Sequence, residues 1–468
     1  MEAAGRGRWS SRAAIVAAVL FAVALLFLAL SFDFAPPEPV GPDVIVVLLD
    51  VLRADHLSVY GYGRETSPKI DAFAQDAVIF DQAISQSTFT KTSVASIFSA
   101  RYPFRHGVYE GSLSDTESNI TSDVLPESLP TLAEAFRDGG YTTAAWVQND
   151  QLRSYMGFQQ GFDLYHERVG KANDIVNAFL SWQRKKRRGS FFAYLHILDI
   201  HGPYTPPPPY DTKFGTYSDT YEVQMPRWRT YRREVARGEV VPSEADIEQL
   251  KALYDGEIAA VDAAVGRLFD ELRSRGLYED SIIVVTSDHG DGFYDHGYVG
   301  HSTTPYEELI RVPLLIKLPG NRFAGTRVAD VQPLVDLAPT LLELAGAPAM
   351  ADTDGVSQVS RLRGAGRAGG EDRAPADTED RVVVSEFKEC VALRDERWKY
   401  MRCGDEAPGL FDLHRDPGEK DNVLELHPEV AERLGERAEA VRTLRRAPAD
   451  RVVVDAETVE ALKALGYL

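Results

Sequence analysis

The sequence predicts an α/β protein whose core is a mostly parallel β-sheet covered by helices. Three short apolar runs, 45–49, 191–195 and 282–285, show no alternation of polar and apolar residues. Parallel strands are buried on both faces, and continuous apolar runs are typical of them. Segments with helical patterns, such as 128–137 and 173–183, lie between the runs. This alternation favours parallel strands that are joined by covering helices.

Each apolar run is followed, on its carboxyl side, by residues that can bind a metal ion. Asp50 follows the first run, Asp199 and His201 follow the second, and Asp288 and His289 follow the third. In an open parallel sheet the carboxyl ends of the strands lie at one edge, and sites form there. We therefore expect these side chains to meet at one site. The alternative is that they are ordinary charges of loops.

The hydroxyl-rich segment 89–93 precedes an apparent helix at 94–99. We predict that Thr90 is a nucleophile, because metal coordination is one way to convert a hydroxyl group into an alkoxide. The amino end of a helix favours an anion or an alkoxide. The alternative is that Thr90, Thr92 or Ser93 is only a helix cap.

Several motifs together resemble the sulfatase family of the alkaline phosphatase superfamily. In chain order they are 47–55 with 60–61, 90–93 with 99–103 and 106–107, 198–204, 287–290, 300–301 with 306–313, and 410–422. They extend over about residues 43–425. The resemblance implies an alkaline-phosphatase-like, sulfatase-like α/β domain with a smaller carboxy-terminal α+β subdomain.

The chain departs from the sulfatase pattern at the nucleophile. Sulfatases convert a Cys or Ser in the signature Cys-x-Pro-Ser-Arg to formylglycine, and Thr90 stands at the position of that Cys. A threonine cannot give this aldehyde because its β-carbon carries a methyl group. Val94 replaces the Arg, and Val51 replaces the second Asp of an Asp-Asp pair. A metal-bound Thr is similar instead to the phosphodiesterases and lipid-headgroup phosphotransferases of the superfamily.

This resemblance implies a single-metal site whose ligands are Asp50, Thr90, Asp288 and His289. Three oxygen ligands and one imidazole suit Mn²⁺, Mg²⁺ or Zn²⁺ better than Ca²⁺. Thr90 is expected to attack phosphorus in line and to form a phosphothreonine intermediate. The metal ion would neutralise a phosphoryl oxygen and lower the pKa of the Thr90 hydroxyl.

Three more residues, His201, His301 and Lys91, are predicted to bind the substrate. The two histidines would bind phosphoryl oxygens or protonate the leaving group. Lys91 would add positive charge beside the nucleophile, and its alternative is a solvated lysine on the first helical turn. In a second hypothesis Asp199, His201 and His301 hold a second metal ion, as in two-metal phosphodiesterases.

The uncharged segment 13–32 is predicted to be a transmembrane anchor, because twenty helical residues span the bilayer hydrocarbon. The basic segment 1–12 precedes it, so the amino end should be cytoplasmic and the catalytic domain exported, periplasmic or extracellular. The Pro-rich segment 33–42 is predicted to be a stiff linker. The alternative for 13–32 is a cleaved signal peptide.

The rest of the chain divides into a catalytic domain (43–350), a loop or linker (351–380) with little apolar content, and a carboxy-terminal subdomain (381–468). Cys390 and Cys403 are the two cysteines of the chain, and they flank a predicted hairpin. In an oxidising compartment they could form a cross-strand disulfide. The alternative is a pair of free thiols.

The chain of 468 residues carries 71 acidic and 51 basic side chains, a net charge of −20. This charge speaks against nucleic acid as a partner, and it means that local positive charge must attract an anionic substrate. The leading prediction is a membrane-anchored, metal-dependent hydrolase or transferase of phosphate esters. Phosphodiesters of lipid headgroups or surface glycans fit its location. The alternatives are a sulfuric ester hydrolase (a sulfatase) and a non-catalytic binding protein of the same fold.

Overall fold

The computed structural model describes residues 40–109, 112–116, 119–185, 189–215, 227–365, 381–447, 449–465 and 467. Among these residues, none of the helices combines the length and the apolar character that a membrane span requires. The predicted cytoplasmic segment (1–12), the predicted anchor (13–32) and residues 33–39 of the predicted linker (33–42) lie outside the described residues.

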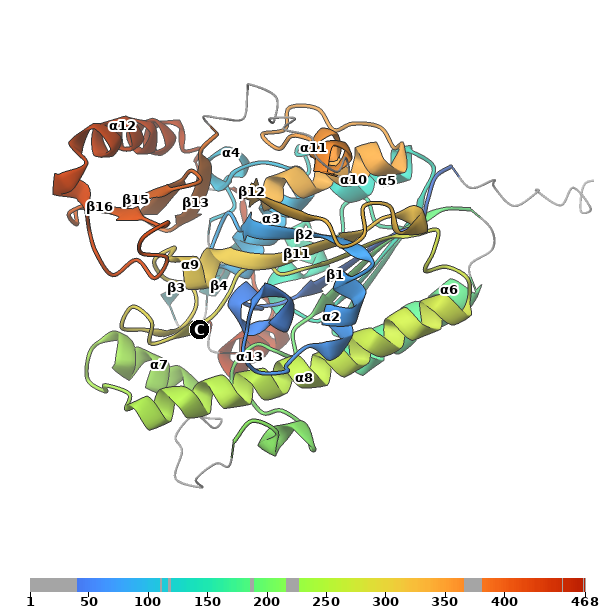
Figure 1. Cartoon of the computed structure of the whole chain (residues 1–468), viewed down its shortest axis with the longest axis horizontal. Coiled ribbons are helices and arrows are strands. Elements are labelled where there is room, and N and C mark those ends of the chain that lie inside the picture. The colour runs from blue at the N-terminus through green and yellow to red at the C-terminus, as the bar shows by residue number, and fades with distance from the viewer. Residues whose placement is uncertain are drawn as a thin grey trace, which may run out of the picture.

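In the described part of the chain, eight strands form one central sheet in the order β12-β2-β11-β8-β1-β7-β5-β6 (Figure 1). These strands are β1 (Val44–Leu49), β2 (Ala77–Ile84), β5 (Thr142–Val147), β6 (Leu164–Glu167), β7 (Phe191–Ile197), β8 (Ile282–Thr286), β11 (Arg311–Lys317) and β12 (Arg327–Pro333). Strand β11 is antiparallel to both of its neighbours, and the other neighbouring pairs are parallel. The predicted α/β class with a mostly parallel sheet is confirmed.

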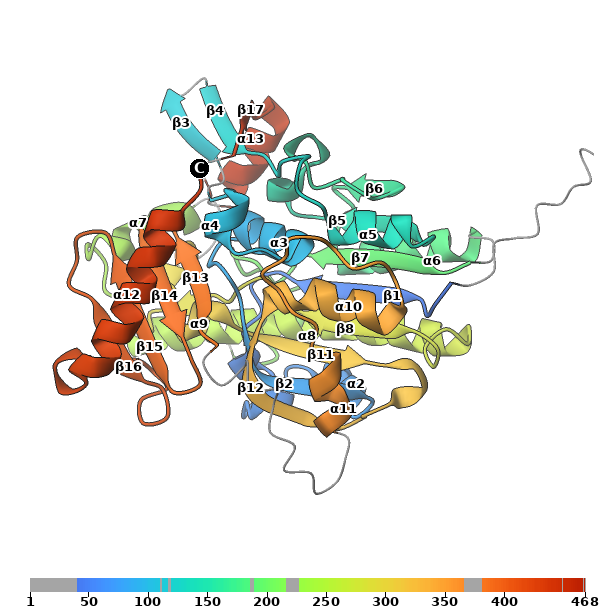
Figure 2. The same ribbon diagram turned by 90° about the horizontal axis from the view of Figure 1, so that it is seen from above.

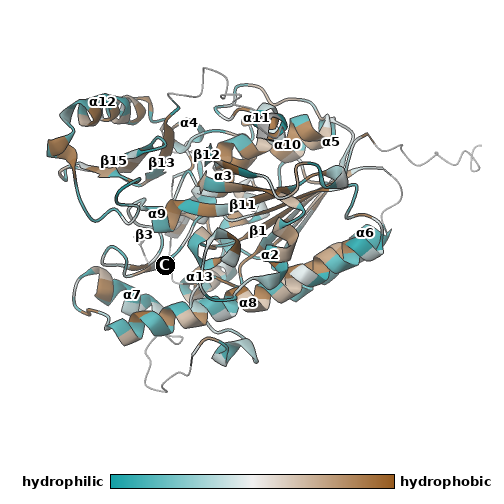
Figure 3. Cartoon of the chain, viewed as in Figure 1, coloured by the Kyte–Doolittle hydropathy of each residue, from teal (hydrophilic) through white to brown (hydrophobic). Residues whose placement is uncertain are grey.

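Helices cover both faces of this sheet (Figures 1 and 2). One face carries α3 (Thr90–Ser99), α5 (Leu132–Asp138) and α10 (Leu337–Ala345), and the other carries α2 (Pro68–Ala74), α6 (Ala172–Lys185) and α8 (Glu244–Ser274). Val44, Val46 and Leu48 of β1 pack into the first core, and Ile45, Val47 and Leu49 into the second. Alternate residues of a strand face opposite sides, so both sides of β1 must be apolar. The central strands are accordingly mostly hydrophobic, and hydrophilic residues gather on α6 and α8 (Figure 3).

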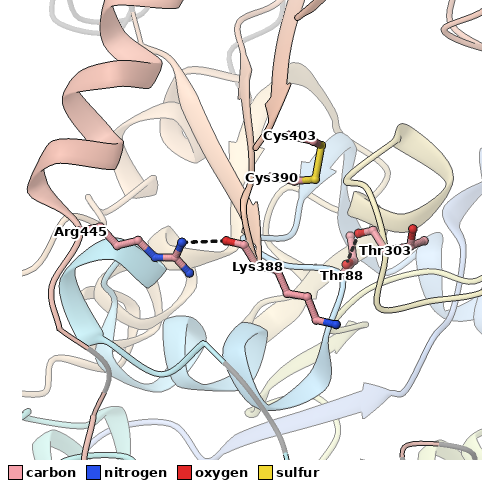
Figure 4. Close-up of a disulfide and its surroundings, with 6 residues drawn as sticks. All are labelled: Thr88, Thr303, Lys388, Cys390, Cys403 and Arg445. Carbon is pink, nitrogen blue, oxygen red and sulfur yellow. Dashed lines mark hydrogen bonds between the residues drawn. A yellow bond between two sulfur atoms is a disulfide. The ribbon is translucent and has the colours of Figure 1, made fainter. Parts of the chain in front are cut away.

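The carboxy-terminal subdomain is a separate antiparallel sheet that is covered by one helix. Its strands are β13 (Val383–Phe387), β14 (Cys390–Arg394), β15 (Trp398–Cys403) and β16 (Gly409–Asp412), and its helix is α12 (Pro428–Leu444). Cys390 lies directly opposite Cys403 in the β14–β15 ladder, and a disulfide joins them (Figure 4).

Two boundaries differ from those expected from the sequence. The segment 351–380 is not all loop, because α11 (Val359–Ala365) lies within it and buries Leu362 in the first core; residues 366–380 lie outside the described residues. The end of the chain leaves the subdomain and returns to the catalytic domain. There β17 (Arg451–Val453) pairs with β4 (Asn119–Asp123), and α13 (Ala456–Ala464) buries Leu462 in the first core.

Shorter elements complete the edge of the sheet where the site lies. They are β3 (Ser112–Thr116), α4 (Pro103–His106), α7 (Trp228–Ala236), α9 (Glu307–Ile310) and the two-stranded ribbon of β9 (Gly292–Phe293) with β10 (Val299–Gly300).

Candidate active site

Two strand ends and one helix start bring the predicted metal ligands together. Asp50 follows β1, and Asp288 and His289 follow β8, which is the parallel neighbour of β1. Thr90 is the first residue of α3. All four side chains are completely buried. The carboxyl edge of the parallel strands is therefore the place where these residues meet.

The arrangement of Asp50, Asp288 and His289 fits a divalent cation. Each offers one ligand atom, and these atoms all lie within 4.8 Å of one another. Oδ1 of Asp50 and Oδ2 of Asp288 are buried without a hydrogen-bond partner, which is costly for carboxylates unless a cation compensates them. Nδ1 of His289 donates to the carbonyl of Gly290 (2.9 Å), so its Nε2 keeps a free lone pair for a ligand bond.

The Thr90 hydroxyl lies directly beside this cluster. Its Oγ1 is 3.2 Å from Nε2 of His289, 3.5 Å from Nδ2 of Asn149 and 3.5 Å from the hydroxyl of Tyr467. The first N–H groups of a helix have no partner within the helix, and the amino end of the helix dipole favours negative charge. The hydroxyl is therefore placed where an alkoxide and a phosphoryl oxygen would be stabilised.

Hydrogen bonds hold the Asp50 carboxylate in its ionised form. Nε2 of His196 donates to Oδ2 of Asp50 (2.8 Å), and Nδ2 of Asn149 donates to the same oxygen (2.7 Å). Burial acts to raise the pKa of Asp50, but the hydrogen bond and the charge of His196 outweigh it and hold that pKa below its usual range. Burial, and then the charge of Asp50, raise the pKa of Asp288. A cation between the two carboxylates would favour the ionised form of both.

The backbone that follows Asp50 is held in an unusual conformation. Val51 has a φ of 57°, which is rare for a β-branched residue. Its N–H donates to Oδ1 of Asp288 (3.2 Å), and its carbonyl accepts from the hydroxyl of Tyr254 (2.8 Å). Val51, at the position of the second Asp of the sulfatase pair, thus uses its backbone to orient Asp288.

His201 and His301 form a facing pair at the same site. Their Nε2 atoms are 3.3 Å apart, and the ring of His301 lies 4.7 Å from that of His289. Nδ1 of His201 donates to the carbonyl of Gly202 (2.6 Å), and Nδ1 of His301 donates to Asp291 (3.2 Å). Burial lowers the pKa of both histidines. Both rings therefore present Nε2 to the space between them, where they can share or transfer a proton.

The second metal set that the sequence suggested is not assembled. The Asp199 carboxylate accepts the N–H of Ala172 at the start of α6 (2.9 Å). Among the described residues, neither Asp199 nor the pair of His201 and His301 belongs to a group of metal-ligating side chains. The carboxylate beside His301 is that of Asp291 instead. The Asp199 carboxylate is instead bonded to the amino end of α6, because it accepts the N–H of the first residue of that helix.

Lys91 is buried and points away from the predicted ligands. Its Nζ donates to Oγ of Ser122, to the carbonyl of Asp123 (3.1 Å) and to the sulfur of Met156 (3.1 Å). Burial lowers the pKa of Lys91 to about 7. The structure therefore joins Lys91 to β4 and does not bring its ammonium group to Thr90 and the predicted metal ligands.

Replacing Lys91 with methionine should remove a pH-dependent cost to folding. Lys91 titrates near 7 in the folded protein and near its ordinary value of 10.5 in the unfolded chain. Between these values the unfolded chain holds the extra proton, so the contribution of Lys91 to stability rises with pH. We expect the stability advantage of Lys91→Met over the wild type to be largest below pH 7. It should shrink by on the order of a few kcal/mol toward pH 10.5.

Denaturant unfolding at a series of pH values measures this difference, and turnover of the same variant should change by no more than a few-fold. Lys463→Met is the matched control, since Lys463 is exposed and pairs with Glu460 at the surface. If Lys91→Met loses turnover while its stability depends on pH as that of the wild type does, the result would instead support the predicted substrate contact of Lys91.

Four residues of the site were not found from the sequence: Asn149, His196, Asp291 and Tyr467. Asn149 follows the end of β5, as Asp50 follows the end of β1, and this position is its signal in the sequence. His196 is a histidine inside the apolar strand β7, and its Nδ1 forms a hydrogen bond with the hydroxyl of Tyr194 (2.9 Å). Tyr467 carries no local signal, because only the return of α13 places it there.

Comparisons with known proteins show which family models and relatives this chain matches. The family model described as Sulfatase matches residues 42–347, and the model described as N-sulphoglucosamine sulphohydrolase, C-terminal, matches residues 291–444. Arylsulfatase K of Bos taurus is 27% identical over 292 residues, which cover 56% of this chain and 53% of that protein. The chain thus spans about half the length of this curated relative.

Solved structures show the same fold. The phosphonate monoester hydrolase of Agrobacterium radiobacter is similar with a TM-score of 0.68 and 22% identity, over 86% of this chain and 96% of that one. A protein solved with its substrate, D-glucosamine-2-N,6-O-disulfate, is similar with a TM-score of 0.69 and 19% identity, over 86% of this chain and 98% of that one. At these identities the likeness shows the fold.

Proposed function

This chain belongs to the sulfatase family, and we propose that it is a metal-dependent hydrolase of phosphate esters, above all phosphodiesters, with Thr90 as the nucleophile. The position of the Thr90 hydroxyl carries the proposal. It lies 3.2 Å from Nε2 of His289, beside the buried carboxylates of Asp50 and Asp288. A threonine cannot be converted to the formylglycine aldehyde, so its own oxygen must react.

Asp50, Asp288 and His289 would hold the divalent cation, with Thr90 as the fourth ligand. When bound, such a cation lowers the pKa of a coordinated hydroxyl and neutralises a phosphoryl oxygen. The side chains Asn149 and Tyr467 approach Oγ1 of Thr90, each at 3.5 Å. Both can donate hydrogen bonds to the oxygens of a phosphoryl group in attack position.

The reaction takes two displacements at phosphorus. In the first, Oγ1 of Thr90 bonds to phosphorus as the bond to the leaving oxygen breaks, and the Thr90 proton passes through the pair of His201 and His301 to that oxygen. In the second, a water oxygen bonds to phosphorus as the bond to Oγ1 breaks, and one water proton returns to Thr90. An alcohol in place of water would give transfer instead of hydrolysis.

A sulfuric ester is the second candidate substrate. It is favoured by the names of the relatives, since the matched carboxy-terminal model and arylsulfatase K both refer to sulfatases. The complete set of Asp50, Thr90, Asp288 and His289 favours an enzyme over a non-catalytic binding protein.

The predicted location stays part of the proposal. We propose that segment 13–32 anchors the enzyme in a membrane and that the catalytic domain is exported. The sequence of that segment supports this, and the disulfide between Cys390 and Cys403 fits an oxidising compartment. Lipid headgroups and surface glycans are then the accessible esters.

A matched substrate panel tests the chemistry. The full chain in detergent is assayed with Mn²⁺, Mg²⁺, Zn²⁺ or Ca²⁺ against one aryl group esterified as phosphomonoester, phosphodiester or sulfate. We expect metal-dependent cleavage of the phosphodiester to be at least about tenfold faster in kcat/KM than cleavage of the sulfate, a difference of about 1.4 kcal/mol in transition-state stabilisation. Preferential cleavage of the sulfate would assign the enzyme to sulfuric esters.

A further inference from the structure

Helix α7 has one apolar face and one basic face. Trp228, Tyr231 and Val235 are buried in the second core, at the spacing of a single helical face. Arg229, Arg232 and Arg233 lie on another side of the helix and line the same pocket. The net charge of the chain is −20, so these three arginines form a local concentration of positive charge.

The apolar face of α7 packs onto the residues that support the histidine pair. The ring of Trp228 meets that of Tyr204 at 5.3 Å, and the hydroxyl of Tyr204 donates to Asp291, the partner of His301. The indole of Trp228 also occupies the space where Gly202 would carry a side chain. Helix α7 is therefore fixed against the active site and contacts β10.

Arg232 crosses the backbone that leads to His301. Its guanidinium donates to the carbonyl of His301 (2.8 Å) and to that of Val299 (3.2 Å). Gly300, between them, has a φ of 91°, and a Cβ at that position would collide with the guanidinium. This glycine thus allows Arg232 to lie directly on the loop that carries His301.

The basic face of α7 opens onto a pocket of about 240 Å³ that shares His301 with the active site. Its walls include Arg229, Arg232 and Arg233 from α7, and His301, Ser302 and Thr303 from the loop after β10. Complete small-molecule sites have volumes of about 300–1,000 Å³. The volume here suits one group of a larger substrate.

The arginines of this pocket form no ion pair within the part of the chain that the structure describes. Among the described residues, no carboxylate forms an ion pair with Arg229, Arg232 or Arg233, whereas the buried Arg53 pairs with Asp55 and Asp295. Nε of Arg229 and Oγ of Ser302 are buried without a hydrogen-bond partner. Burial, and then the charge of Arg233, lower the pKa of Arg229. An anion would satisfy these groups.

Hydrogen bonds connect the pocket to the segment that carries the proposed nucleophile. The N–H of Ser302 donates to the carbonyl of Thr88 (3.0 Å), and Oγ1 of Thr88 donates to the carbonyl of Thr303 (2.8 Å; Figure 4). Thr88 lies two residues before Thr90. Hydrogen bonds therefore connect the arginine pocket to the segment that carries Thr90. A substrate that binds at the pocket and at Thr90 would contact one connected part of the structure.

We propose that this arginine pocket binds a second oxyanion group, a sulfate or a phosphate, of the substrate whose ester reacts at Thr90. The proposal rests on the proposed function and narrows it to substrates that carry a further anionic group near the scissile ester. Guanidinium groups bind such oxyanions through paired hydrogen bonds, which lysines cannot form in the same way. Arg232 also positions His301, so Arg229 and Arg233 are the residues to test.

Binding of unreactive analogues tests the pocket without any need for turnover. The probes are phenylphosphonate and its derivatives with a sulfonate at the meta or para position, measured by calorimetry on the metal-loaded full chain. We expect the better sulfonated probe to bind wild type about tenfold more tightly than phenylphosphonate. In Arg229→Gln/Arg233→Gln this ratio should fall to about one, because both charged donors are gone. A derivative of phenylphosphonate that carries a second phosphonate in place of the sulfonate is compared in the same way. It separates a pocket for phosphate from a pocket for sulfate.

Arg237→Gln is the matched control, since Arg237 follows the same helix, is exposed and does not line the pocket. It should keep the wild-type ratio. Arg229→Lys/Arg233→Lys should keep part of it. Equal binding of all probes to wild type, or an equal loss of the ratio in Arg237→Gln, would overturn the proposal. If no ester is turned over but the ratio behaves as expected, the proposed reaction fails and the anion pocket stands.

Discussion

Thr90→Ala is expected to lower turnover by about 10³-fold or more, in line with the loss of a nucleophile in other enzymes, while the protein stays folded. The oxygen that we propose to bond to phosphorus is then absent, and the neighbouring His289 and Asn149 cannot replace it. The lost contacts of the hydroxyl are few, so the free energy of unfolding should fall by only about 1 kcal/mol. Steady-state kinetics and thermal unfolding measure the two effects.

Thr92→Ala is the control for this variant. Thr92 is also a buried hydroxyl in the first turn of α3, but its Oγ1 donates to the carbonyl of Tyr109 (3.1 Å) and not to the site. It should keep most of the activity. Acid quenching of wild type with labelled phosphodiester should leave label on Thr90, and Thr90→Ala should leave none. Full activity of folded Thr90→Ala would refute the mechanism.

Asp288→Asn is expected to lose the bound metal ion and, with it, at least about 100-fold in turnover. The asparagine keeps the Oδ1 atom that accepts from the backbone of Val51 and His289. It removes the charge of Oδ2, which is buried without a hydrogen-bond partner beside Asp50. Metal content per chain after gel filtration, together with kcat, measures the outcome.

Relative to wild type, Asp288→Asn should be at least as stable without metal and less stable with metal. Without a cation, the buried carboxylates of Asp50 and Asp288 repel each other, so Asp288→Asn should be at least as stable as wild type. With metal at about 100 times its dissociation constant, wild type should gain about 2.7 kcal/mol and the variant almost nothing. Unfolding with added metal or chelator gives all four values.

Asp291→Asn serves as the comparison, because Asp291 is buried in the same site but bonds to Tyr204 and His301. It should retain the metal ion and the metal-dependent gain in stability. Metal loss in both variants alike would mean that the cation lies elsewhere. Undiminished metal binding by Asp288→Asn would remove this residue from the ligand set.

The sequence by itself determined the sheet and the cluster of candidate metal ligands at its edge. The apolar runs of β1, β7 and β8 are long enough, and apolar on both faces, to be central parallel strands. Once they are parallel neighbours, their carboxyl ends must lie together. Asp50, Asp288 and His289 were therefore predictable as one cluster, although more than 200 residues separate the first from the other two.

Only the tertiary structure decided which nearby polar groups join that cluster. Lys91 and Asp199 stand next to site residues in the sequence, yet one bonds to β4 and the other caps α6. Asp291 takes the place beside His301, and the return of α13 brings Tyr467 to Thr90. The direction of a side chain depends on the partners that surround it after folding. Strand periodicity predicts where each strand ends, but it does not determine which partners a side chain meets there.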